Sequence, residues 1–152
     1  FKAALHEINE YLAKQIAGDG EGATALFEVK VKGAESVEAA KVLAKSIACS
    51  NLTKTAIAGH DANWGRIVCA MGYSGAQFDP EKVDLFFESK AGKIQIAEDG
   101  VALYFSEEKA TEILSQPEVT AIADVKMGDA EATAWGCDLT HGYIDINADY
   151  RS

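Results

Sequence analysis

The first residues of the chain repeat large apolar side chains at the spacing of an α-helix. One side of that helix would carry Phe1, Leu5, Ile8, Leu12 and Ile16, which are three or four positions apart. Gly18 follows where a glycine commonly ends a helix. The pattern therefore predicts an amphipathic helix over residues 1–17.

Alternating apolar and polar residues predict strands along much of the remaining chain. Phe27, Val29 and Val31 alternate with charged residues, which is typical of a half-buried strand. Similar runs predict strands over 53–59, 83–89, 93–98, 101–105, 118–128, 131–139 and 143–150. The Asp99-Gly100 pair predicts a hairpin turn between two of them.

Helical spacing returns in two further segments, 35–50 and 106–115. Each begins with a serine that can cap a helix, Ser36 in the first and Ser106 in the second. Residues 60–75 combine helical spacing with three glycines, so both helix and loop stay open there. Helices mixed with runs of strands predict an α+β fold, in which helices layer on a mixed or antiparallel sheet.

Composition limits the classes of function. The 152 residues are 48% hydrophobic and 25% charged, which suits a globular domain that needs no disulfides. The net charge of −10 argues against a nucleic-acid partner, because phosphate binding requires a positive surface. No apolar run could span a membrane and no signal peptide is present, so we expect a cytoplasmic protein. Since the chain begins in helical sequence without Met, we expect a fragment or a processing product.

Cysteines and histidines do not form a recognisable metal motif. The three cysteines are odd in number and widely spaced, which argues against a disulfide framework. Cys137 and His141 could supply two metal ligands, whereas a zinc site needs three or four protein ligands. We therefore expect no metal and no Cys–His catalytic pair.

The sequence DGEGAT, residues 19–24, is the least ordinary stretch. It follows a predicted helix and opens a strand, which is the reverse of a Rossmann loop, and it lacks the Lys of a P-loop. Its glycines are expected to form a tight turn. Thr24 is internal, so it has no free α-amino group of its own to act as a base, and threonine is a good strand former; we expect it to begin the strand rather than act as a nucleophile.

Three other motifs accompany DGEGAT in order along the chain. They are SIACSNLTKTAIAGHDANWGRI (46–67), ATAWGCDLT (132–140) and INADYRS (146–152). Together the four resemble the ornithine acetyltransferase family of arginine biosynthesis, also called glutamate N-acetyltransferases. The resemblance covers essentially the whole chain and implies the C-terminal part of the family's β chain. Residues 1–17 would then end the preceding catalytic-core segment, and 18–152 would form the C-terminal α+β domain.

The resemblance also implies a reaction. The family's precursor cuts itself before a threonine, which becomes the nucleophile and would lie upstream of Phe1. It takes acetyl from N-acetylornithine, forms an acetyl-threonine and passes the group to glutamate; some members use acetyl-CoA as donor, and no bound cofactor is implied. The partners would be the α chain and the rest of the β chain, usually as an α2β2 assembly. This chain alone is expected to be inactive, and a fungal source would imply the mitochondrial matrix.

Three residues correspond to the family's substrate contacts. They are Glu21 in DGEGAT, Asn147 in INADY, and the terminal Ser152. By this resemblance Glu21 offers a carboxylate to the ammonium groups of ornithine, while Asn147 and Ser152 offer hydrogen bonds to substrate carboxylates and amides.

The chain departs from the family pattern at three positions. Ala25 stands where a lysine is common, His60 where a glutamate is common, and Asp145 lies in a segment that commonly reads differently. These departures leave the acetyl donor open. The alternative is a non-catalytic binding or assembly module on the same fold, in which substitution of Glu21 would change nothing.

Overall fold

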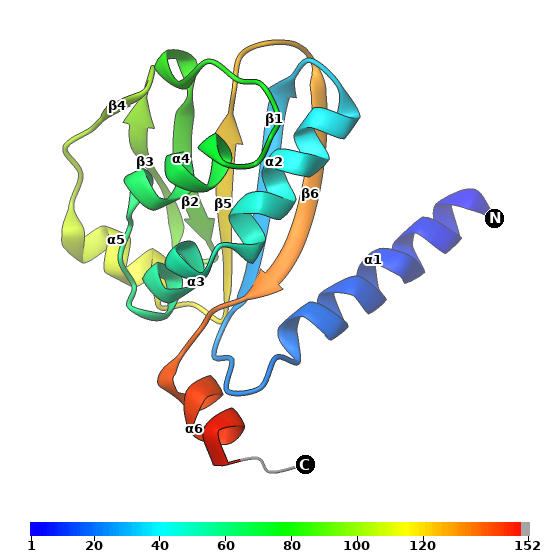
Figure 1. The fold of residues 1–152 in the computed structure, drawn as a ribbon, viewed down its shortest axis with the longest axis vertical. Helices are drawn as coiled ribbons and strands as arrows, with labels where there is room; N and C mark the ends of the chain where they lie inside the picture. The colour runs from blue at the N-terminus through cyan, green and yellow to red at the C-terminus, as the bar shows by residue number, and fades with distance from the viewer. Residues whose placement is uncertain (150–152) are drawn as a thin grey trace.

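The computed structural model of the chain describes residues 1–149 and is built around one mixed sheet (Figure 1). Six strands lie in the order β4-β3-β2-β5-β1-β6. Their bounds are β1 Leu26–Ala34, β2 Asp84–Ser89, β3 Gly92–Glu98, β4 Val101–Ala102, β5 Glu118–Asp124 and β6 Ala130–Cys137. β1 and β5 are parallel, and the other neighbouring pairs are antiparallel. The α+β class predicted from the sequence is confirmed.

Among the residues described, four helices cover one face of this sheet, and two further helices lie beyond it. The covering helices are α2 Val37–Cys49, α3 Asn51–Ala58 and α4 Trp64–Gly72, while α5 Glu107–Leu114 packs against β2 and β3 (Figure 1). A short 3₁₀ turn, η1 Pro80–Lys82, leads into β2. The first and last helices, α1 Lys2–Gly18 and α6 His141–Asp149, lie outside this layer. In the described part of the chain no helix is long and apolar enough to cross a membrane.

The core lies between the sheet and α2. On β1 the side chains of Phe27, Val29 and Val31 are 0% exposed, as are Leu43 and Ile47 on α2. The alternation along β1 places its charged residues on the opposite face of the sheet, as the pattern predicted. Burial of each large apolar side chain contributes about 1.5–3 kcal/mol relative to exposure.

Two segments predicted as strands are helices. Residues 53–59 fall largely within α3, where Thr53, Ala56 and Ile57 are buried at helical spacing and Ser50 caps the first turn. The apparent alternation in this short segment was therefore misleading. Residues 143–149 belong to α6, because β6 has already ended at Cys137 and the chain has left the sheet.

The structure adds detail to the predictions for two other segments. The ambiguous stretch 60–75 contains α4, whose first turn is capped by the Asn63 side chain accepting from the Arg66 N–H at 3.1 Å. The strand predicted over 101–105 is shorter than expected, since β4 covers Val101–Ala102.

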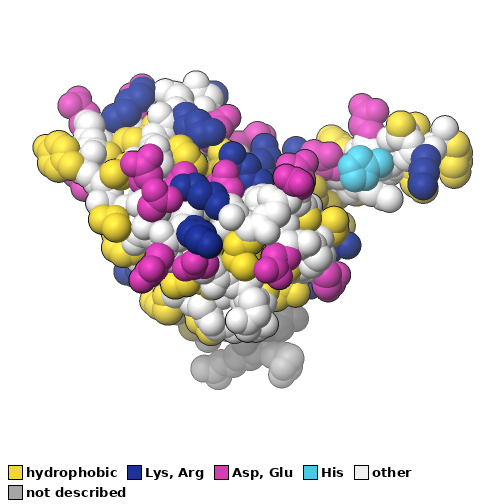
Figure 2. All heavy atoms as spheres, turned by 90° about the horizontal axis from the view of Figure 1, so that it is seen from above, with side chains coloured by type: hydrophobic (Ala, Val, Ile, Leu, Met, Phe, Trp, Pro, Cys, Tyr) yellow, Lys and Arg dark blue, Asp and Glu magenta, His cyan; other side chains and the backbone are white. Residues whose placement is uncertain are grey.

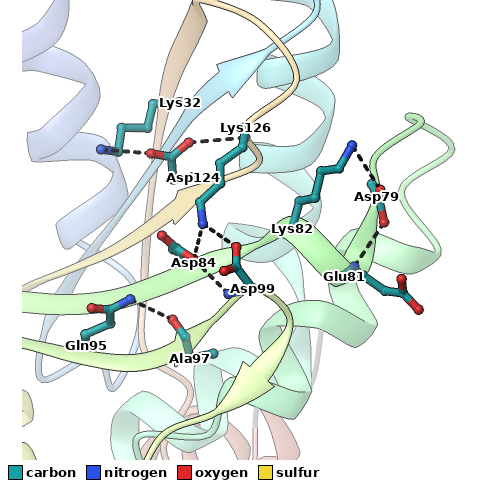
Figure 3. A network of polar contacts seen from close by, with 10 residues as sticks. All are labelled: Lys32, Asp79, Glu81, Lys82, Asp84, Gln95, Ala97, Asp99, Asp124 and Lys126. Atoms are coloured by element: carbon teal, nitrogen blue, oxygen red, sulfur yellow. Dashed lines mark hydrogen bonds and ion pairs between the residues drawn. The ribbon is translucent and has the colours of Figure 1, made fainter.

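An ion-pair network closes the end of the sheet farthest from the Glu21 loop (Figure 3). Lys126 Nζ lies 2.7 Å from Asp84 Oδ1 and 2.6 Å from Asp99 Oδ1. The hydrogen bonds that Lys126 donates to these two carboxylates raise its pKa above the usual range. Asp84 also accepts the Asp99 N–H at 2.9 Å, so the network fixes the Asp99-Gly100 turn, where both residues have positive φ.

We predict that Leu43→Ala lowers the free energy of unfolding by about 2–5 kcal/mol, because it removes a fully buried side chain and leaves a cavity. Leu52→Ala is the matched control, since that leucine is also helical but 55% exposed, and its effect should stay within about 0.5 kcal/mol. Urea unfolding followed by circular dichroism measures both. Equal losses would contradict the assigned packing.

Candidate functional site

The loop that contains Glu21 lies beside the chain that leaves β6. The antiparallel register pairs Leu26 at the start of β1 with Cys137 at the end of β6. The loop 19–25 therefore enters the sheet where the segment 138–142 departs from it (Figure 1). The first and third of the sequence motifs meet at this place.

Asp138 is the buried centre of this contact, with 2% of its surface exposed. Its Oδ1 accepts the N–H groups of Thr24 at 2.8 Å and of Ala25 at 3.1 Å. Its Oδ2 accepts the Thr24 hydroxyl at 2.5 Å, and its own N–H donates to the Ala25 carbonyl at 3.2 Å. A buried carboxylate is costly unless donors surround it, and here three donors do.

Thr140 makes a second bridge between the two segments. Its hydroxyl donates to the Gly22 carbonyl at 2.6 Å and accepts the Gly142 N–H at 3.1 Å. Gly22 has a φ of +70°, and a Cβ there would lie 2.6 Å from the carbonyl carbon of Gly142. The glycine turn predicted from the sequence is thus present, and Gly22 allows two backbones to touch.

Glu21 and Asn147 meet above this contact. Asn147 Nδ2 donates to Glu21 Oε2 at 2.8 Å and to the Tyr143 carbonyl at 2.9 Å. Both partners can only accept, which fixes the orientation of the amide. The amide oxygen of Asn147 is therefore the group that it can offer to a ligand, together with the remaining carboxylate oxygen of Glu21.

The structure brings together two of the three residues that the resemblance implies. Glu21 and Asn147 are 126 positions apart in the sequence and are hydrogen-bonded. Ser152 lies outside the described residues. Thr24 lies two residues before β1, and its hydroxyl donates to Asp138. The sequence predicts its place at the start of the strand, but it does not predict the contact with Asp138.

Sequence reasoning missed Asp138 and Thr140. A signal was present, because an acid directly after a strand and a threonine directly before a helix are typical of turns and helix caps. What the sequence could not indicate is that these groups bond to a loop more than a hundred positions away.

A hollow of about 670 Å³ lies on the other side of the loop. It is bounded by the end of α1, by Ala23–Leu26 and by Pro117 and Glu118, whereas Glu21 and Asn147 do not line it. Within residues 1–149, no three His, Cys, Asp or Glu side chains converge to hold a metal ion.

Glu28 attaches α1 to the sheet just beyond the loop. Its carboxylate accepts the Trp135 indole N–H at 2.6 Å and lies 3.0 Å from Lys30 Nζ and 3.7 Å from Lys14 Nζ. Burial alone would raise the pKa of Glu28. The hydrogen bonds from Trp135 and Lys30 and the charges of Lys30 and Lys14 outweigh burial, so the pKa is lowered.

This architecture is shared with a solved structure. The crystal structure of the arginine biosynthesis bifunctional protein ArgJ from Bacillus halodurans matches with a TM-score of 0.91 and 46% identity. The match covers 97% of this chain and 68% of that one. The fold around the Glu21 loop is therefore that of an arginine-biosynthesis protein.

Sequence comparisons identify the family. The model of the ArgJ family matches residues 1–152, and the chain belongs to this family. It is 54% identical over 149 residues to the arginine biosynthesis bifunctional protein ArgJ of Thermotoga neapolitana, covering 98% of this chain and 38% of that protein. It is 46% identical over 156 residues to the glutamate N-acetyltransferase of Methanothermobacter thermautotrophicus, covering 100% of this chain and 39% of that protein. The chain thus spans well under half the length of these relatives.

We predict that Glu28→Gln lowers the free energy of unfolding at pH 7 by about 1–3 kcal/mol, because it removes charge-assisted hydrogen bonds. The pKa of Glu28 is below its ordinary value of 4.5, so its contribution is complete above that pH and is lost as the pH falls through the lowered value. The free energies of unfolding of the wild type and of Glu28→Gln should therefore converge as the pH falls below this value. Glu131→Gln is the control, because Glu131 is an exposed carboxylate that lines, together with Glu28, the groove between α1 and the sheet. A difference that stays constant with pH would contradict this assignment.

Proposed function

We propose that this chain is the C-terminal, substrate-binding portion of a glutamate N-acetyltransferase. The complete enzyme would move acetyl from N-acetylornithine to glutamate through an acetyl-threonine intermediate. The nucleophilic threonine would be supplied by another part of the enzyme, and acetyl-CoA is a possible second donor. The observation that carries the proposal is the hydrogen bond between Glu21 and Asn147, which joins two residues of separate motifs.

Two comparisons support this proposal. One relative is named glutamate N-acetyltransferase, and another is named as a bifunctional protein of arginine biosynthesis. The chain spans 38% and 39% of their lengths, which fits the view that other segments contribute the remaining groups of the active site.

The geometry of the pair supports recognition of an amino group. Glu21 contributes a negative charge, and Asn147 has both N–H groups engaged and so offers an acceptor. Two acceptors suit an ammonium or amide N–H of ornithine. They do not suit its carboxylate, so of the two groups that the resemblance implies for Asn147, carboxylates and amides, this arrangement favours an amide N–H.

The surface of α1 supports association with the rest of the enzyme. The apolar stripe of α1, defined as Leu5, Ile8, Leu12 and Ile16, is between 45% and 77% exposed. The opposite side of the helix, with Glu10 and Lys14, faces the sheet across a groove of about 720 Å³. Figure 1 shows α1 extending from the body, and hydrophobic side chains lie along this arm in Figure 2. We place the preceding catalytic segment, within an α2β2 assembly, against this stripe.

We predict that Glu21→Gln in the full-length enzyme raises the KM for N-acetylornithine by about 10- to 100-fold. Loss of a charge-assisted hydrogen bond to an ammonium costs about 1.5–3 kcal/mol, and each 1.4 kcal/mol is tenfold. Steady-state transfer of acetyl to glutamate measures the effect.

Asp19→Asn is the control for this measurement, because Asp19 is an exposed acid two positions away in the same loop. It should leave the KM within about twofold. If Glu21→Gln and Asp19→Asn both leave the KM unchanged, Glu21 does not bind the substrate. If the full-length enzyme transfers no acetyl group, the non-catalytic alternative is favoured.

We predict that Leu12→Glu weakens association of this chain with the rest of the enzyme by at least tenfold. Burial of a leucine contributes about 1.5–3 kcal/mol, and an acid in its place adds a desolvation cost. Light scattering and titration of separately expressed parts measure the dissociation constant.

Ala3→Glu is the control for this surface. Ala3 is exposed and lies on the side of α1 opposite the stripe, by helical spacing. It should leave the dissociation constant unchanged. Equal effects of the two substitutions would show that the stripe is not the interface.

A further inference from the structure

We propose that Asp138 and Thr140 are positioning residues for substrate binding. They would act by holding the Glu21 loop against α6, so that Glu21 and Asn147 stand at the separation a substrate requires. This inference rests on the proposed function for its kinetic consequence, while its structural part is independent of it.

Asp138 orders the loop because its carboxylate accepts three hydrogen bonds from two consecutive residues. Thr24 N–H, Thr24 O–H and Ala25 N–H all donate to the one carboxylate. The carboxylate is 2% exposed, so water competes little for these donors. These bonds fix the backbone at Thr24 and Ala25, which lie three and four positions after Glu21.

Thr140 fixes the other side of Glu21. Its hydroxyl donates to the carbonyl of Gly22, the residue directly after Glu21, and accepts the N–H of Gly142 in the first turn of α6. The segment that holds the loop is therefore the same segment that begins the helix carrying Asn147. A displacement of Asp138 or Thr140 would move Glu21 and Asn147 relative to each other.

The other contacts of the loop point the same way. Between Gly20 and Ala25, and within the residues that the structure describes, every hydrogen bond to another segment goes to Asp138, Thr140 or Asn147. The position of Glu21 thus depends on these contacts and on the Gly22–Gly142 backbone contact.

A double-mutant cycle in the full-length enzyme tests this inference. Asp138→Ala should raise the KM for N-acetylornithine by about tenfold or more when Glu21 is present, and by less than about twofold in the Glu21→Gln background. Asp138→Asn keeps an acceptor for the two N–H groups, so it should restore most of the wild-type KM. If Asp138→Ala does not fold, Thr140→Val replaces it in the same cycle, because it removes the hydroxyl that bonds to Gly22 and Gly142.

Asp84→Asn is the matched control for a loss of stability alone. Asp84 is a half-buried carboxylate that orders the Asp99-Gly100 turn. It lies at the opposite end of the sheet from the Glu21 loop, a distance of roughly 20 Å along the strands. The substitution should lower the melting temperature and leave the KM unchanged. Equal KM changes for Asp84→Asn and Asp138→Ala would overturn the positioning role.

Hydrogen–deuterium exchange separates failure of this inference from failure of the proposed function. Peptides covering residues 20–25 should exchange faster in Asp138→Ala and Thr140→Val and be unchanged in Asp84→Asn. If exchange rises as expected but Glu21→Gln has no kinetic effect, the loop is positioned and the proposed function is wrong. If exchange is unchanged, or if the KM effects of Asp138 and Glu21 substitutions multiply, the positioning role is wrong.

Discussion

The antiparallel pairing of β1 with β6 is the constraint on which the rest of the site depends. It places Leu26 opposite Cys137, so the loop entering β1 and the segment leaving β6 share one end of the sheet. The buried apolar residues of β1 specify this register, because a shift of one residue would turn them to the open face. Contacts between distant motifs follow from that register and from the buried carboxylate of Asp138.

The α+β class and most strands could be predicted from the sequence, because the alternation in β1 and the Asp99-Gly100 turn are local signals. The predictions failed where a short segment fits both the two-residue repeat of a strand and the 3.6-residue repeat of a helix. Residues 53–59 alternate like a strand, yet their buried positions follow a helix, and only packing against the neighbouring helices decides between them. Glu21 and Asn147 were identified through a resemblance, whereas their contact and the role of Asp138 required the topology.

The helices differ in how far they bury their apolar side chains. α2 buries a continuous side against the sheet, whereas α1 turns its charged side to the sheet and leaves its large apolar residues exposed. Globular proteins seldom leave such a row uncovered. The sheet and its covering helices thus share one continuous core, and the apolar stripe of α1 lies outside it.

The backbone contact between Gly22 and Gly142 has a thermodynamic consequence. Since no side chain separates the two segments, their spacing does not depend on the choice of a rotamer. The loss of conformational entropy that comes with ordering this region is therefore incurred during folding. Two backbones in contact leave the Glu21 loop and α6 little room to approach each other further.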